Sequence, residues 1–201
     1  MFKFSLRRRT KSERGFTLID MLATTAIVAT VGAVAIPQIK KSMDNQRLGI
    51  DVRNVEREMQ TARLDAVKAN QPIRLRFDCP EVGMYRRVEL MGTVNAPANG
   101  DDSAANATAR CRTNGPYPYP AADRDPLTRP NNDGPIQRLS SQVAFLQVQT
   151  LEFWPNGSVH VDSNTAQMWP VIGSTPITIK INKGTTVKMI QVNGLGKIQI
   201  Q

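Results

Sequence analysis

The sequence predicts an α+β fold, in which one long N-terminal helix packs on a β-rich, sandwich-like head. Three observations predict this fold. An apolar run extends from Phe16 to Ile36, and an amphipathic stretch at helical spacing follows it. Short alternating segments separated by Gly, Pro and Asn then fill the C-terminal half. We therefore expect a basic leader at 1–15, a transmembrane helix at 16–37, an amphipathic helix at 38–71 and the head at 72–201.

Most of the positive charge lies at the N-terminus. The 201-residue chain has a net charge of +9, and residues 1–15 hold six basic side chains against one acidic side chain. A basic flank keeps its end of a membrane helix in the cytoplasm, so we expect the head on the opposite side of the membrane. Because little excess charge remains for the head, the overall charge is only a weak indication of nucleic-acid binding.

The apolar run from Phe16 to Ile36 is long enough to cross a bilayer. Its 21 residues would form a helix, which at the usual rise is about 31 Å long. A secretory signal cleaved at Ala33-Val34-Ala35 and a plain membrane anchor are the alternatives. The run is long for a secretory signal, and Arg7-Arg8-Arg9 lies too far from it for a twin-arginine address. Neither alternative accounts for the carboxylate of Asp20.

Asp20 is the unexpected residue of this segment. A carboxylate inside hydrocarbon costs about 2.5–3.5 kcal/mol and usually has a partner. No Lys or Arg lies between Phe16 and Lys40 to provide one. Cleavage after Gly15 would create a positive amino terminus at Phe16, one helical turn from Asp20. In an assembly, the carboxylate would equally suit the amino terminus of a neighbouring subunit.

The N-terminal segment resembles the class III signal of type IV pilins and pseudopilins. The resemblance rests on a basic leader followed by Gly15, Phe16, Thr17, Leu18 and Asp20, with Pro37 further along. It implies cleavage after Gly15 by prepilin peptidase, N-methylation of Phe16, a helix kink at Pro37 and pairing of subunits through Asp20. The usual fifth mature residue of the family is Glu, and the Asp found here is one methylene shorter.

The same resemblance implies partners and a location. The partners would be other pilins or pseudopilins in a filament, the prepilin peptidase and methyltransferase, and an inner-membrane assembly platform. Before assembly, the chain would cross the inner membrane once, with its leader in the cytoplasm and its head in the periplasm. No cofactor is implied.

The stretch after Pro37 predicts an amphipathic helix. Asn70 is expected to cap its C-terminus, and Pro72 cannot continue its hydrogen-bond ladder. Its apolar stripe is short, which favours packing on its own domain over a coiled coil. The stripe comprises Leu48, Val52, Val55, Met59, Ala62 and Ala66.

Beyond Pro72 the pattern is that of short strands around one long loop, at 92–138. Cys79 and Cys111 are expected to face an oxidising compartment, where we predict a disulfide between them. The expected strands are Ile73–Phe77, Tyr85–Met91, Val143–Val148, Leu151–Trp154, Ser158–Val161, Ile177–Ile181, Val187–Val192 and Lys197–Ile200.

Three further segments resemble the GspH/FimT branch of this superfamily. They are Ala62–Val67 with Asn70 and Ile73–Leu75, then Phe153–Gly157, and finally Asn193–Ile198. The resemblance implies a minor type IV pilin that contributes to the assembly or the tip of a pilus. A minor pseudopilin of a type II secretion system is the alternative, and neighbouring genes would separate the two.

The sequence holds no catalytic or metal-binding motif of the common kinds, so we expect no enzyme and no metal. Asp101-Asp102 and Asp123-x-Asp125 lack the ligand series of a calcium loop. His160 is expected to be a surface residue of a strand.

A third alternative is a DNA-binding minor pilin for DNA uptake. Four lysines of the terminal strands are the candidate phosphate contacts, although solvent-facing lysines are common on strands. They are Lys180, Lys183, Lys188 and Lys197.

Overall fold

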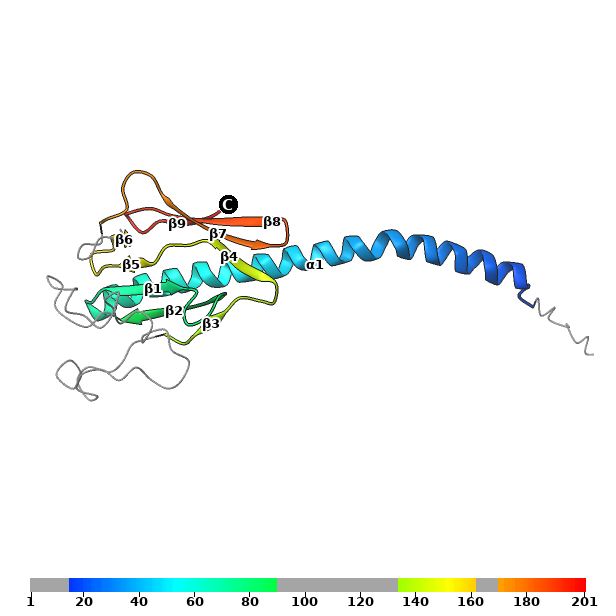
Figure 1. Cartoon of the computed structure of the whole chain (residues 1–201), viewed down its shortest axis with the longest axis horizontal. Helices are drawn as coiled ribbons and strands as arrows, with labels where there is room; N and C mark the ends of the chain where they lie inside the picture. The colour runs from blue at the N-terminus through cyan, green and yellow to red at the C-terminus, as the bar shows by residue number, and fades with distance from the viewer. Residues whose placement is uncertain (1–14, 90–133, 162–169) are drawn as a thin grey trace, which may run out of the picture. The chain divides into compact units, whose positions relative to one another are not determined.

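The computed structural model describes residues 15–89, 134–161 and 170–201 (Figure 1). The chain divides into two compact units, Met1–Met43 and Asp44–Gln201, which are described separately. Helix α1, Leu18–Ala69, contributes to both units. Residues 1–14 of the predicted leader and residues 92–133 of the predicted loop lie outside the described residues.

The part of α1 in the first unit is apolar and exposed. Among the described residues, α1 is the one helix long and apolar enough to cross a membrane. Large apolar side chains such as Leu18, Ile19 and Val28 are all more than two thirds exposed. Pro37 lies inside α1, where it removes one backbone hydrogen bond without ending the helix. This unit therefore has the composition and length of a membrane-spanning helix.

The part of α1 in the second unit is amphipathic, as predicted. The apolar stripe from Leu48 to Ala66 is buried in full. The helix ends at Ala69, and Asn70 follows in the left-handed conformation with φ of 52°. The amide of Gln71 then donates to the carbonyl oxygen of Ala66 at 3.2 Å. This is the predicted C-terminal cap, because Asn tolerates the left-handed region better than most residues.

We expect Asn70→Ala to lower the free energy of unfolding by about 1–2 kcal/mol. In the left-handed conformation the Cβ of alanine lies too close to the following carbonyl oxygen, and alanine has no polar side chain to compensate for this. Asn70→Gly is the matched control and should not destabilise the protein, because glycine adopts a φ of 52° freely. Denaturation of the full-length protein in detergent, followed by tryptophan fluorescence, measures both. Equal losses for the two variants would contradict this account of the cap.

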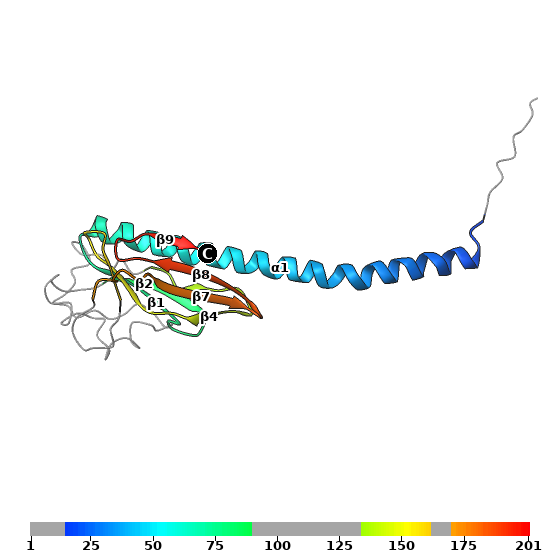
Figure 2. The same ribbon diagram turned by 90° about the horizontal axis from the view of Figure 1, so that it is seen from above.

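The head contains two antiparallel sheets. The first has the strand order β3-β2-β1-β5-β6, and the second has the order β4-β7-β8-β9. In Figure 2 strands β1 and β2 of the first sheet and β4 and β7 of the second lie on the same side of the C-terminal part of α1. The strands are β1 Ile73–Phe77, β2 Met84–Glu89, β3 Gln137–Arg138, β4 Val143–Gln147, β5 Leu151–Phe153, β6 Val159–Val161, β7 Ile177–Lys183, β8 Thr186–Val192 and β9 Ile198–Ile200.

The predicted α+β fold class is confirmed, with one long helix packed against antiparallel sheets. Each expected strand is present with small shifts at its ends. Strand β3 was not predicted, because its two residues, at the end of the expected loop 92–138, carry no alternating pattern. Strand β7 runs two residues further than expected, to Lys183.

The core lies between the buried stripe of α1 and the sheets. Leu75 of β1, Phe153 of β5 and Ile190 of β8 are fully buried there with the stripe. Each such side chain contributes about 1.5–3 kcal/mol through its removal from water. Burial also raises the pKa of the Tyr85 hydroxyl, and the carboxylates of Glu58 and Asp51 raise it further, so this hydroxyl stays protonated.

Four carboxylates on one edge of α1 fix the helix to the head. They recur every seven residues and therefore lie almost in line along the helix, with a drift of about 20° per step. Lys183 pairs with the first at 3.0 Å, the backbone and hydroxyl of Ser140 donate to the second at 3.0 Å each, and Arg87 pairs with the third and the fourth. We call these residues the acidic row: Asp44, Asp51, Glu58 and Asp65.

Candidate functional site

The predicted processing segment lies at the start of α1. Gly15 and Phe16 are exposed, and a Cβ added to Gly15 would meet no atom within 4 Å. Thr17 precedes the first helical residue, and its hydroxyl and amide donate to the Asp20 carboxylate at 2.7 and 3.2 Å. The Asp20 amide approaches the Thr17 hydroxyl oxygen at 3.3 Å. The peptide bond after Gly15 is therefore accessible immediately before an ordered helix start.

Thr17 and Asp20 form a reciprocal capping box, which satisfies backbone donors that the first turn of a helix leaves without partners. This role of Asp20 was not predicted, although the Thr-x-x-Asp spacing that signals it is readable in the sequence. The carboxylate thus has polar partners at the start of α1. Its pairing with an amino terminus at Phe16 stays a prediction.

Three segments that are distant in the sequence meet around the side chain of Arg63. Its guanidinium donates to the carbonyl oxygens of Gly196 at 3.1 Å and of Leu195 at 3.2 Å. It also lies against Gly157, since a Cβ added there would be 3.4 Å from Nη2 of Arg63. We call this arrangement the Arg63 junction; it joins α1 to the turn at Pro155–Gly157 and the turn at Asn193–Gly196.

Glycine is required at the junction either because another part of the chain approaches closely or because the backbone has a positive φ. Gly157 and Gly196 have φ of 84° and 75°, which favour glycine. Gly194 packs against the chain segment at Ile172, where an added Cβ would be 2.2 Å from the carbonyl oxygen. The side chain of Asn193 holds its own turn by accepting from the Leu195 and Lys197 amides at 3.1 and 2.8 Å.

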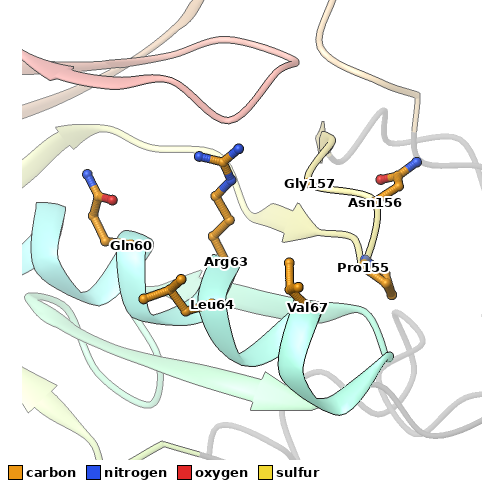
Figure 3. A pocket seen from close by; sticks show the side chains of 7 residues that line it. All are labelled: Gln60, Arg63, Leu64, Val67, Pro155, Asn156 and Gly157. Carbon is orange, nitrogen blue, oxygen red and sulfur yellow. The ribbon is translucent and has the colours of Figure 1, made fainter.

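A surface pocket of about 400 Å³ opens beside the junction. Figure 3 shows helix side chains on one wall and the Pro155–Gly157 turn opposite them. Leu64 and Val67 on the helix wall are more than half exposed. The described lining is apolar apart from the amides of Gln60 and Asn156 and the guanidinium of Arg63, so an apolar group beside a cation would fit there. Its lining residues are Gln60, Arg63, Leu64, Val67, Pro155, Asn156 and Gly157.

A buried polar row crosses the first sheet. Arg74 of β1 pairs with Glu152 of β5 at 2.7 Å, with side chains 5% and 1% exposed. The indole N–H of Trp154 also donates to Glu152. The Trp154 ring stacks on His160 at 4.6 Å between centroids, and Nε2 of His160 is 3.0 Å from the Ser158 hydroxyl oxygen.

The expectation that His160 is a surface residue is therefore wrong. His160 is 9% exposed, because Trp154 covers its ring and strand β5 pairs beside it. His160 is buried because the sheet brings Trp154 and strand β5 beside it. The alternation of residues within one strand does not predict these neighbours.

The four candidate DNA-contacting lysines do not lie on one face. Lys183 is buried and paired with Asp44, so the expectation that it faces solvent is wrong. Lys188 shares the helix side of the sheet, where a Cβ on Gly49 would be 3.3 Å from its Nζ. Lys180 lies on the opposite face from Lys183, and Lys197 lies in the exposed turn before β9. These lysines offer no shared phosphate-binding surface.

Cys79 is buried and disulfide-bonded. The sequence offers Cys111 as its partner, and Cys111 lies outside the described residues, as do Asp101, Asp102, Asp123 and Asp125. Within residues 15–89, 134–161 and 170–201, no group of three or more His, Cys, Asp or Glu side chains is placed to hold a metal ion.

No known family, curated protein or solved structure matches the chain.

Proposed function

We propose that the chain is a minor type IV pilin-like subunit that is cleaved after Gly15 and assembled into a filament. A secretion pseudopilus is the alternative filament, and the proposed role is structural, with no enzymatic activity. The observation that carries the proposal is the exposed, apolar first part of α1, which follows Gly15-Phe16 directly and carries an acid at Asp20. An apolar helix of this length needs either a bilayer or other helices around it.

The head supports a role in building rather than in catalysis. The acidic row and the buried stripe fix α1 to the sheets, so a load applied to the helix would pass to the head. The pocket beside the Arg63 junction contains no acid–base or nucleophilic set. These features suit a subunit whose helix packs in a filament while its head is held at the surface.

The test of the proposal is recovery of the protein with sheared filaments from cells that carry the complete assembly machinery. We expect the processed protein in the filament fraction at low abundance relative to the main subunit. Confinement to the membrane fraction, in cells whose main subunit does assemble, would contradict the proposal.

Asp20 has two candidate roles, and a pair of variants separates them. Asp20→Asn keeps an oxygen for the Thr17 amide and hydroxyl but removes the charge, whereas Thr17→Val removes the hydroxyl and keeps the charge. If the carboxylate pairs with an amino terminus, Asp20→Asn should lower filament recovery about 10-fold or more, and Thr17→Val should have a small effect. The measurement is the filament-to-membrane ratio of each variant. The opposite ranking would assign Asp20 to helix capping alone.

A further inference from the structure

The side of α1 that faces away from the sheets in the head unit carries an exposed stripe at helical spacing. Ile50 and Leu64 are 56% and 67% exposed, and Arg53 and Arg57 lie between them. The i, i+3, i+4 spacing places these residues on one face. We call this surface the outward face: Ile50, Arg53, Arg57, Gln60 and Leu64.

The carboxylates of the acidic row and the arginines of the outward face lie on different sides of this part of the helix. The four carboxylates of the acidic row all bond to Ser140, Arg87 or Lys183 of the head. In the described part of the chain, no carboxylate pairs with Arg53 or Arg57. Glu56, the remaining acid of this stretch, is half-buried one turn from Arg53 and forms no ion pair with it. Two arginines four residues apart repel each other by about 0.2–0.5 kcal/mol. The outward face therefore carries two arginines whose charges no ion pair offsets among the described residues.

We propose that the outward face docks an acidic, amphipathic segment of a different filament subunit. Carboxylates of the partner would accept from Arg53 and Arg57, and an apolar side chain would enter the pocket between α1 and the Pro155–Gly157 turn. This inference rests on the proposed function and names the chemistry of the partner.

The helices of two copies of this chain do not complement each other at the outward face. Symmetric pairing would place Arg53 and Arg57 against the same arginines, and like charges across an interface are strongly disfavoured. The acidic row of a second copy is already bonded to its own head. Because the acidic row is already in use within the head, we place the complementary charge on a different subunit whose helix acids face outward.

The experiment measures binding of a fluorescent, amphipathic helical peptide with Glu–Glu at i, i+4 beside leucines to the full-length protein in detergent. We expect affinity to fall about 10-fold or more between low and high salt. We expect a similar loss with Arg53→Glu, Arg57→Glu. The control Lys180→Glu, Lys197→Glu has the same charge change, on strand β7 and in the turn before β9, and should bind as the wild type does.

Several outcomes would overturn the inference. They are equal binding to both double variants, equal binding of a Lys–Lys version of the peptide, and absence of binding. If the protein self-associates and only the double variant Arg53→Glu, Arg57→Glu abolishes this, the face binds a second copy. If the protein binds vesicles of anionic lipid and only this double variant abolishes that, the face binds a membrane. Because the assay needs neither cleavage nor a filament, its result is independent of the filament-recovery test.

Discussion

Replacing Arg74 with methionine is expected to lower the free energy of unfolding by about 3–5 kcal/mol, which is the usual cost of leaving a buried charge without its partner. Glu152 is 1% exposed and lies 2.7 Å from the guanidinium, so its carboxylate would lose its counter-charge without gaining water. Chemical denaturation of the full-length protein in detergent measures the change.

The double variant Arg74→Met, Glu152→Gln distinguishes a lost ion pair from lost packing. Glutamine is neutral and still presents an oxygen to the indole N–H of Trp154. We expect it to recover more than half of the stability lost by Arg74→Met, because no buried charge remains. A double variant as unstable as the sum of the two single variants would show that the pair does not act as a unit.

Gly194→Ala is expected to lower the free energy of unfolding by at least about 1–3 kcal/mol, the range for a side chain forced into a packed site. The added Cβ would be 2.2 Å from the backbone carbonyl oxygen of Ile172, so a backbone segment must move. The shift would also disturb the bond from the Val159 amide to the Gly194 carbonyl oxygen, which is 3.0 Å long.

Gly173→Ala is the matched control for this position. It lies in the neighbouring segment, and an added Cβ would meet nothing within 4 Å. We expect its stability to equal that of the wild type or to exceed it slightly. A cost for Gly173→Ala similar to that for Gly194→Ala would point to backbone entropy rather than to the close approach at Ile172.

The fold was readable from the sequence where periodicity carries the information. The stripe from Leu48 to Ala66 has helical spacing, and Asn70 ends the helix where its residue type predicts. The strands of the C-terminal half follow from alternation and from Gly-containing turns. Strand β3 is too short for either signal, and it is held by pairing to β2 rather than by its own pattern.

The burial of Lys183 was also readable and was missed. Ile179, Ile181 and Lys183 are every second residue of one strand, so the lysine must share the buried face of the isoleucines. Its partner Asp44, by contrast, was not readable, since it lies far away in the sequence on α1. A lone sequence gives the face of a side chain more readily than its partner.

The Arg63 junction shows the same limit. The motifs at Ala62–Val67, Phe153–Gly157 and Asn193–Ile198 stood out separately in the sequence. No spacing rule relates them, because they meet only after the helix and both turns are in place. The pocket and the cationic outward face likewise depend on which side of α1 the sheets cover.

The mature N-terminus of the protein purified from its own cells tests the central proposal most directly. By mass spectrometry, we expect residues 1–15 to be absent and the new terminus to be an N-methylated Phe16. Gly15→Val should stay at full length, whereas Gly32→Val should be processed, since an added Cβ meets nothing within 4 Å at either site. An intact N-terminus, or one at Ile36 after cleavage behind Ala33-Val34-Ala35, would contradict the account.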